Sequence, residues 1–198
     1  MTFRVALTFD AEHPDRPFRT GGTERVLDLL SGEGVAATFF LQGRWAEAFP
    51  EVACAVADRG HLIGNHSFYH ARMPLLSTPG LATDIRAAER AIIAATGVDP
   101  RPWFRCPFGA GTDDPRVRAS IERLGYREVN WDVDGADWRP SRRGKGMANQ
   151  IVADTVAHGD GAVVLLHPWT TATGLGLAPL IAGLRDAGAT FVRMDALG

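Results

Sequence analysis

Two histidines four residues apart, His66 and His70, stand in the stretch GNHSFYH, directly after a short apolar run. On one turn of a helix this spacing places two imidazoles on the same face, where both can bind one small cation. Two unrelated surface histidines are the simpler alternative. A carboxylate from Asp10 or Glu12, in LTFDAEH, would complete a set of two nitrogens and one oxygen. Such a set suits zinc, cobalt or a similar divalent ion and leaves positions open for water and substrate.

Other polar residues could supply the chemistry around that ion. A bound divalent metal lowers the pKa of water and polarises a carbonyl group. The second carboxylate after the first strand could then accept a proton from the water, and His167 could protonate the leaving group. Arg105 and Asp137 are expected to pair and to orient the base, or else to form a structural ion pair between two strand ends. His61, which begins an apolar run, is interpreted as a structural histidine.

These residues need a scaffold, and strand-like and helix-like patterns alternate through the whole chain. Apolar residues at helical spacing recur between the apolar runs, as in Leu81, Ile85, Ala88 and Ile92. The alternation predicts an α/β fold with a mainly parallel sheet, and the continuous apolar run AVVLL suits a strand that helices cover. Seven strands are predicted, over residues 3–9, 37–41, 61–63, 103–105, 126–133, 162–167 and 190–193.

The unusual polar residues fall at the C-terminal ends of predicted strands. In chain order, these residues are Asp10, Glu12, His66, His70, Arg105, Asp134, Asp137 and His167. In parallel α/β folds this edge of the sheet is where ligands bind and catalysis occurs. The sequence therefore predicts one polar site at this edge. Periodicity alone leaves open whether the sheet is a barrel or an open one.

The amino-acid composition is typical of one class of protein and argues against others. The 198 residues, 45% hydrophobic and 22% charged, fit a soluble globular chain with one domain, residues 1–198. A net charge of −2 argues against a nucleic-acid partner, and no apolar stretch approaches the ~18 residues of a membrane span. Cys54 and Cys106 are expected to be free thiols. We expect a cytoplasmic location if Met1 is the native start, and a secreted protein otherwise.

One segment is strongly basic. RPSRRGKG, residues 139–146, is interpreted as one exposed loop. A solvated turn is the simpler interpretation, and a lid that contacts an anion is the alternative.

Five segments that contain these polar residues follow one another along the chain: LTFDAE, GNHSFYH, FRCPFGA, WDVDGADW and VVLLHP. In sequence and order they resemble the motifs of the polysaccharide deacetylases, also called the NodB-homology family or carbohydrate esterase family 4. The resemblance covers essentially the whole chain. It implies a distorted (β/α)7 barrel and a metal-dependent hydrolase that removes acyl groups from amides or esters.

The resemblance also implies a role for each residue of the predicted site. Asp10 resembles the catalytic base, His66 and His70 resemble the metal-binding histidines, and His167 resembles the catalytic acid. Arg105 resembles the arginine that orients the base.

Further positions follow from the same resemblance. Asp137 resembles the partner of that arginine. The backbone N–H of Phe108 falls where the family helps to bind the oxyanion. Trp138 and Leu165 resemble residues that line the pocket for the acyl methyl group.

The first motif departs from the family pattern FDDG, in which the second aspartate binds the metal. Ala11 has that position here, and Glu12 follows it. Some branches of the family carry an Asp-x-Asp or Asp-x-Glu pattern, and the longer glutamate side chain can reach from a shifted backbone position. The metal site is therefore assigned to Glu12, His66 and His70. Zinc is the expected ion, with cobalt, nickel or manganese as alternatives.

Smaller departures lie elsewhere in the motifs. Cys106 replaces a usual proline, Phe108 a common tyrosine, and Pro168 a common aspartate. Residues 15–22 look like a short insertion beside the site that alters substrate access.

Three functions are compatible with these patterns. The leading hypothesis is a divalent-metal-dependent hydrolase that removes acetyl groups from N-acetylated or O-acetylated sugars or polysaccharides. The second is a cytoplasmic metal-dependent hydrolase of small C–N substrates such as cyclic imides, ureides or formamides. The third, suggested by Ala11, is a metal-free pseudoenzyme that binds glycans. The expected partner is thus an acetylated carbohydrate or small amide, with no nucleic acid and no membrane.

Overall fold

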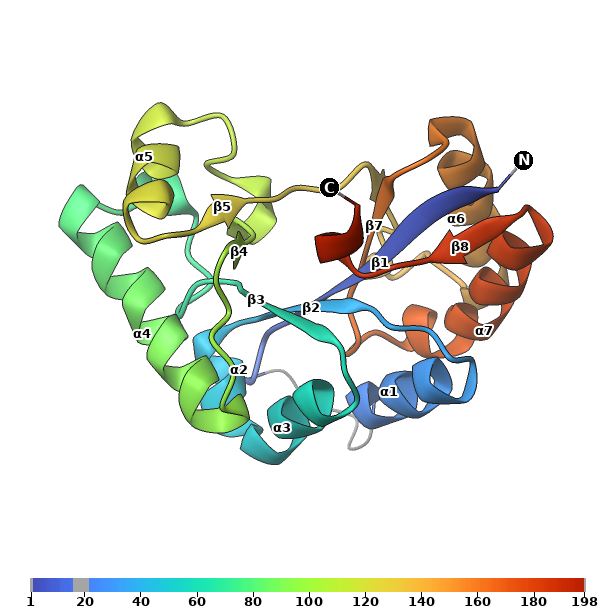
Figure 1. The fold of residues 1–198 in the computed structure, drawn as a ribbon, viewed down its shortest axis with the longest axis horizontal. Helices are drawn as coiled ribbons and strands as arrows, with labels where there is room; N and C mark the ends of the chain where they lie inside the picture. Colours follow the sequence, from blue (N-terminus) through green and yellow to red (C-terminus); the bar gives the residue numbers. More distant parts are fainter. Residues whose placement is uncertain (1, 16–21, 198) are drawn as a thin grey trace.

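A long and largely buried first strand organises the fold. The computed structural model describes residues 2–15 and 22–197 (Figure 1). β1 (Phe3–Ala11) lies at the centre of the sheet, and its side chains alternate between two apolar environments. Val5 and Leu7 join the cluster between sheet and helices, whereas Ala6 joins the cluster inside the curl of the sheet. This alternation decides which residues of the strand can reach the interior.

The sheet is parallel throughout its recorded ladders and curls into a partial barrel. Strand order is β5-β4-β3-β2-β1-β7-β6, and β8 pairs with the start of β1. The other strands are β2 (Thr38–Leu41), β3 (Leu62–Asn65), β4 (Trp103–Phe104), β5 (Arg127–Glu128), β6 (Val133–Asp134), β7 (Ala162–Leu166) and β8 (Ala189–Phe191). The predicted α/β fold, a distorted barrel with a parallel sheet, is confirmed.

One predicted strand was wrong in its extent. Residues 126–133 do not form a continuous strand but two short ones, β5 and β6, which lie at opposite ends of the strand order. The chain between them offers its carbonyl oxygens to a side chain instead of a neighbouring strand. Arg105 donates from Nε to Val129 O (3.3 Å) and from Nη2 to Asn130 O (3.1 Å).

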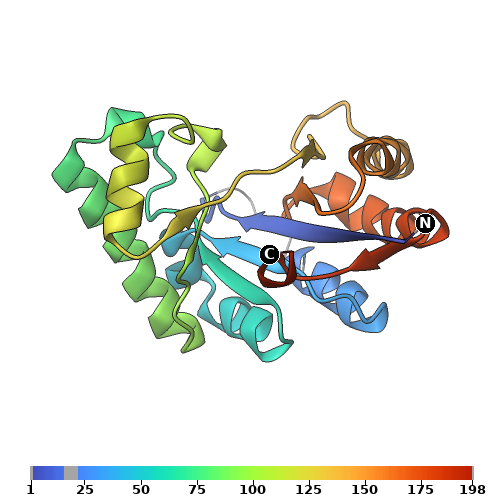
Figure 2. The ribbon, with the colours of Figure 1, turned by 45° about the horizontal axis from the view of Figure 1, so that its top comes forward.

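The described residues contain seven α-helices. They pack around the outside of the sheet (Figures 1 and 2). They are α1 (Gly22–Gly32), α2 (Gly43–Ala48), α3 (Pro50–Asp58), α4 (Thr78–Thr96), α5 (Pro115–Arg123), α6 (Gly144–His158) and α7 (Thr171–Asp186). Short 3₁₀ turns occur at Met73–Leu75, Pro107–Gly109 and Met194–Ala196. The predicted basic loop therefore ends early, because Gly144–Gly146 form the first turn of α6.

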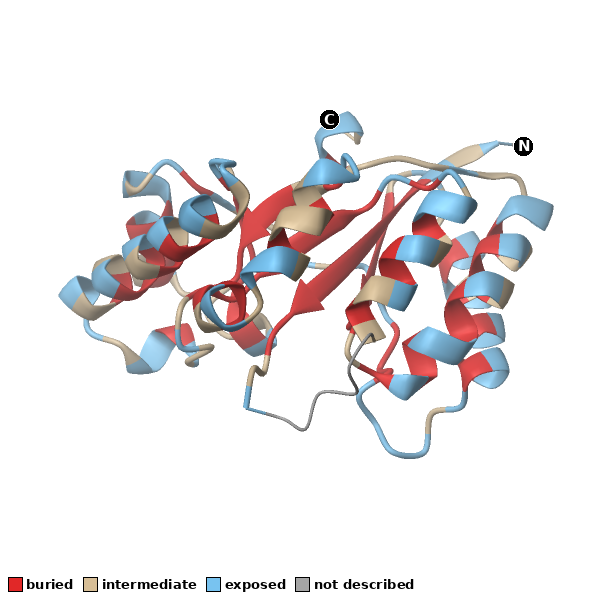
Figure 3. Cartoon of the chain, turned by 90° about the horizontal axis from the view of Figure 1, so that it is seen from below, coloured by how far each residue is buried: buried red, intermediate tan, exposed pale blue. Residues whose placement is uncertain are grey.

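Local sequence explains where the long helices start and end. α4 begins after Ser77, whose hydroxyl accepts a hydrogen bond from Gly80 N (3.2 Å), and ends at Gly97, which has φ +70°. Asp114 caps α5 in the same manner. Figure 3 shows that the buried residues follow the sheet and the helix faces turned toward it.

Two further expectations concern the whole chain. Cys54 and Cys106 are free thiols, as predicted. Across residues 2–15 and 22–197, none of the helices combines the length and apolar character that a membrane crossing requires.

Candidate metal centre and active site

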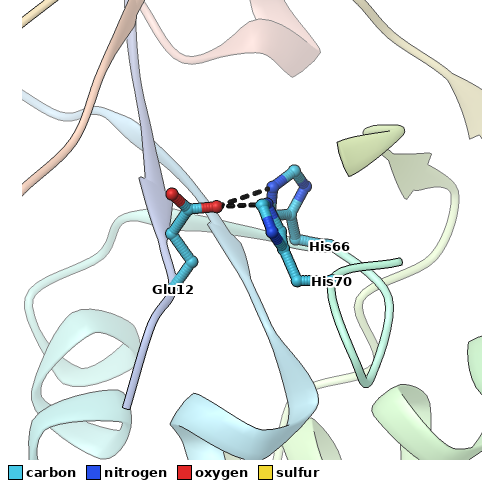
Figure 4. Close-up of side chains that lie close together, drawn as sticks. All are labelled: Glu12, His66 and His70. Atoms are coloured by element: carbon cyan, nitrogen blue, oxygen red, sulfur yellow. Dashed lines mark ion pairs between the residues drawn. The ribbon is translucent and has the colours of Figure 1, made fainter. Parts of the chain in front are cut away.

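Three side chains converge at the C-terminal edge of the sheet. One ligand atom from each of Glu12, His66 and His70 lies within 4.8 Å of the other two, and Figure 4 shows Glu12 pointing at both imidazoles. His66 Nδ1 lies 2.9 Å from Arg105 O. Because a carbonyl oxygen only accepts, Nδ1 carries the proton and Nε2 offers its lone pair. Two nitrogens and one carboxylate fit a divalent transition metal.

The pleat of β1 explains why Glu12 rather than Ala11 reaches this position. Ala11 is fully buried in the cluster beneath the helices. Asp10 and Glu12 project to the opposite side, where His66 Nε2 lies 3.5 Å from Asp10 Oδ2 and 3.5 Å from Glu12 Oε2. A carboxylate two residues after Asp10 is therefore on the same side as Asp10.

His13 holds the second oxygen of Glu12. Its Nε2 lies 2.9 Å from Glu12 Oε1, and its backbone N–H donates to Gln42 Oε1 at 3.0 Å. Burial alone would raise the pKa of Glu12, but hydrogen bonds from His13, His66 and His70 hold that pKa well below its usual range. The carboxylate is thus ionised and oriented, as a metal ligand must be. Sequence reasoning gave His13 no such role.

The two histidines come together on a loop and not on a helix, which was the arrangement for which their spacing was first considered. The segment after β3 is a loop in which Ser67 and His70 have positive φ values of 63° and 57°. Side chains satisfy its backbone: Asn65 Oδ1 accepts from Ser67 N (2.9 Å), and Ser67 Oγ accepts from His70 N (2.9 Å). These local bonds replace the helical ones that the spacing suggested.

A buried aspartate on α4 fixes the middle of the same loop. Asp84 accepts hydrogen bonds from Phe68 N (3.0 Å) and Tyr69 N (3.1 Å). Gly43 lets α2 approach, because a Cβ there would lie 2.4 Å from Phe68 Cδ2 and 2.8 Å from Ala88 Cα. Sequence reasoning missed Asp84, although a carboxylate on the apolar face of a predicted helix is a readable signal.

Arg105 lies at the centre of the barrel and is fully buried. Its Nη1 donates to Asp10 Oδ1 (2.9 Å) and to Thr8 Oγ1 (2.8 Å), and its guanidinium stands 4.1 Å from the centroid of the Phe40 ring. The expected pairing of Arg105 with Asp137 was wrong. Asp10, on the interior strand β1, is the acid next to Arg105, whereas Asp137 follows β6 at one end of the strand order.

Asp137 forms hydrogen bonds with His167 instead. Its Oδ1 lies 2.7 Å from His167 Nδ1, and its Oδ2 accepts from His167 N (2.8 Å). Two hydroxyls that sequence reasoning missed, those of Thr170 (2.8 Å) and Thr173 (2.5 Å), donate to the same Oδ2. Burial would lower the pKa of His167, but the hydrogen bond and charge of Asp137 outweigh it and raise that pKa to about 9.

The converging residues surround one pocket of about 450 Å³. Asp10, Glu12, His66, His70 and His167 line it, and so do three residues predicted near the substrate: Phe108, Trp138 and Leu165. Phe108 has a positive φ of 59°, and Leu165 lies on β7. The predicted insertion beside the site, residues 15–22, falls mostly outside the described residues. Its first residue, Asp15, forms an ion pair with Arg44 (3.0 Å).

The chain resembles known proteins over nearly its full length. The family model for polysaccharide deacetylase matches residues 2–129. A peptidoglycan-N-acetylmuramic acid deacetylase of Bacillus subtilis is 30% identical over 194 residues, which cover 98% of this chain and 70% of that protein. A solved deacetylase with bound substrate, T48, superposes with a TM-score of 0.85 at 31% identity, covering 99% of this chain and 90% of that one.

The fold also occurs in a relative that is called a pseudoenzyme. A pseudoenzyme of carbohydrate esterase family 4 from Bacillus anthracis has a TM-score of 0.85 and 27% identity, covering 99% of this chain and 65% of that one. Deacetylases of this family generally use a divalent metal, and Glu12, His66 and His70 are placed to hold one. With the matching family model, the relatives and the shared fold all in agreement, this chain belongs to the polysaccharide deacetylases, the hydrolases of carbohydrate esterase family 4.

Proposed function

We propose that this protein is a zinc-dependent deacetylase that removes acetyl groups from N-acetylated or O-acetylated sugars or polysaccharides. The observation that carries the proposal is the convergence of Glu12, His66 and His70 within 4.8 Å, in a pocket that Asp10 and His167 also line. This donor set matches the ligands of catalytic zinc sites, which leave a position open.

When bound, the metal would lower the pKa of a water molecule and polarise the carbonyl oxygen of the acetyl group. The protein's own groups supply the proton transfers. Asp10 is held through Oδ1 by Arg105, so Oδ2 faces the pocket and is placed to accept a proton from the attacking water. Arg105 is itself fully buried and held by several hydrogen bonds, which supports a fixed orientation of Asp10.

We propose that His167, which also lines the pocket, returns a proton to the leaving group. Asp137 holds Nδ1, which leaves Nε2 facing the pocket at 3.8 Å from Glu12 Oε1. A protonated imidazole there can donate to the departing amine or alcohol. Leu165 and Trp138 supply apolar surface in the same pocket, which suits the methyl group of an acetyl substituent.

Zinc titration of the metal-stripped protein by calorimetry tests the ligand assignment. We expect one tight site in the wild type, no tight site in Glu12→Ala, and wild-type binding in Glu122→Ala, which removes an exposed glutamate from α5. Wild-type zinc affinity in the Glu12→Ala protein would overturn the assignment of Glu12 as a ligand.

A substrate panel with the zinc-loaded protein tests the reaction. It contains N-acetylated chitooligosaccharides, peptidoglycan fragments, acetylated monosaccharides and small cyclic imides. Acetate release from any of the acetylated sugars supports the proposal. Turnover of imides alone would replace it with the hydrolysis of small C–N bonds, and glycan binding without zinc binding or turnover would make the protein a pseudoenzyme.

A further inference from the structure

A second cavity, of about 530 Å³, opens next to the catalytic pocket. We call it the basic groove and define it by Trp138, Arg139, Arg142, Arg143, Trp169 and Thr171. It lies where the chain leaves β6 and enters α6, beside the start of α7. The groove contains most of the basic segment for which the sequence left a solvated turn and an anion contact as alternatives.

The basic groove is continuous with the catalytic pocket. Trp138 and Trp169 line both cavities. Asp137 forms part of the groove wall, and its other side holds His167 in the catalytic pocket. A sugar chain that places one acetyl group in the catalytic pocket would therefore extend a neighbouring sugar into the groove. The ring of Trp138, 50% exposed, gives that chain an apolar surface at the junction.

The groove carries an excess of positive charge. Arg139, Arg142 and Arg143 all line it, and within the described part of the chain none of their guanidinium groups has a recorded ion pair with an acid. The guanidinium group of Arg139 lies over the ring of Trp138, 5.2 Å from the ring centroid, in a cation–π contact. Among the described lining residues the one acid is Asp137, which is 3% exposed and already accepts bonds from His167 and two threonines.

We propose that the basic groove binds an anionic substituent, a carboxylate or a phosphate ester, on the sugar next to the one that is deacetylated. This inference rests on the proposed function and names a substrate class for it. Guanidinium groups bind both anions through paired, charge-assisted hydrogen bonds. Three arginines within five residues repel one another, so a bound anion relieves a repulsion that a neutral glycan leaves in place.

Matched substrates test the proposal. Acetate release is measured on an N-acetylated oligosaccharide whose alternate sugars carry a lactyl carboxylate, as in muramic acid, and on the same compound with each carboxylate converted to a neutral amide. We expect kcat/KM to favour the carboxylate form by ~10-fold or more, mainly through KM, and the preference to shrink as salt is raised. A third arm, with a sugar phosphate in place of the carboxylate, identifies which anion the groove prefers.

Two double variants show where the preference resides. Arg142→Ala with Arg143→Ala should bring the carboxylate-to-amide ratio close to one. Arg86→Ala with Arg90→Ala removes two exposed arginines from α4, on the opposite side of the molecule in Figure 1, and should keep the wild-type ratio. A ratio that survives the loss of Arg142 and Arg143 would overturn the assignment of the groove.

The outcome separates this inference from the proposed function. Equal kcat/KM on the carboxylate, phosphate and amide forms would refute the groove while leaving the deacetylase in place. If no substrate releases acetate, the proposed function fails, and calorimetric binding of the carboxylate and amide forms decides the inference. Tighter binding of the carboxylate form that depends on Arg142 and Arg143 supports it, and equal binding refutes it.

Discussion

The carboxylates of Asp10, on β1, and Glu12, directly after its end, point to the same side and lie at equal distances, 3.5 Å, from His66 Nε2. The residue between them, Ala11, faces the helices and is fully buried. Two carboxylates spaced two residues apart can therefore face the same pocket, because the side chains alternate through the end of the strand.

An aspartate at position 11 should therefore not replace Glu12. In Ala11→Asp the new carboxylate would be buried without a partner among apolar side chains, at a cost of about 3 kcal/mol or more. Urea unfolding should show this loss, and zinc calorimetry of Ala11→Asp combined with Glu12→Ala should show no tight site. Wild-type zinc affinity in the double variant would contradict the register of β1.

Removing the charge of the base should affect turnover far more than metal binding. In Asp10→Asn the amide cannot accept the proton from water, so kcat should fall by ~10²-fold or more while one zinc site remains. Acetate release and zinc calorimetry give the two readouts. Asp28→Asn, which changes an exposed aspartate on α1, serves as the control. Near-normal kcat in Asp10→Asn would remove Asp10 from the role of base.

Thr173 should act as a positioning residue for His167 through Asp137. Thr173→Val keeps the shape but removes the hydroxyl that donates to Asp137 Oδ2 at 2.5 Å, and we expect kcat to fall by roughly 3- to 30-fold. Thr173→Ser retains the hydroxyl and should restore most of the activity. If the role were only structural, both variants would lose stability in urea unfolding while kcat of the folded enzyme stayed at the wild-type value.

Asp84 should couple the stability of the histidine loop to metal affinity. Asp84→Ala leaves the N–H groups of Phe68 and Tyr69 without their acceptor, which should cost about 1–3 kcal/mol in unfolding free energy. Because these N–H groups lie between His66 and His70, zinc affinity should fall as well. Asp84→Asn keeps one acceptor oxygen and should give an intermediate result. Unchanged zinc affinity in Asp84→Ala would show that the loop holds its shape without this residue.

His61 should make the stability of the fold depend on pH. Burial, together with the charges of Arg59 and Arg193, lowers the pKa of His61 to about 4, whereas an unfolded histidine has a pKa of ~6.5. Below pH ~6.5 the unfolded chain binds a proton that the folded chain does not. Stability from this group is therefore fully present above pH ~6.5 and is lost as pH falls toward 4, by up to about 3 kcal/mol.

A substitution isolates that contribution. His61→Asn keeps an acceptor for Ala37 N, which donates to His61 Nδ1 at 3.1 Å, but does not titrate. Urea unfolding at several pH values should show a shallower loss of stability between pH 6.5 and 4 in this variant. His158→Asn, at an exposed histidine on α6, should follow the wild type. Equal pH dependence in wild type and His61→Asn would contradict the lowered pKa.

The edge of the sheet that holds the candidate site could be predicted from the sequence, because ligands bind at the carboxyl ends of the strands in parallel sheets. Asp10, Glu12, His66 and His167 follow strands that the apolar runs made visible, and the structure brings them into one pocket. The family motifs added which of these residues resemble ligands and which resemble the acid and base.

What could not be predicted depends on contacts between distant segments. The spacing of His66 and His70 is compatible with a helix. Asp84, sixteen residues after Phe68, is one of the contacts that hold this segment as a loop instead. The partner of Arg105 depends on strand order, which places β1 rather than β6 within reach of its guanidinium. α2 was not predicted, because six residues are too few to show a helical period.

Arg105 joins the two open ends of the curled sheet, since its guanidinium binds the segment between β5 and β6 as well as Asp10 on β1. The same side chain thus completes the architecture and orients the base. In evolutionary terms, loss of catalysis and loss of this arginine are separate events, because a chain without activity still contains the carbonyl oxygens and the carboxylate that Arg105 binds. An arginine retained at position 105 would therefore reflect the needs of the fold as well as those of the activity.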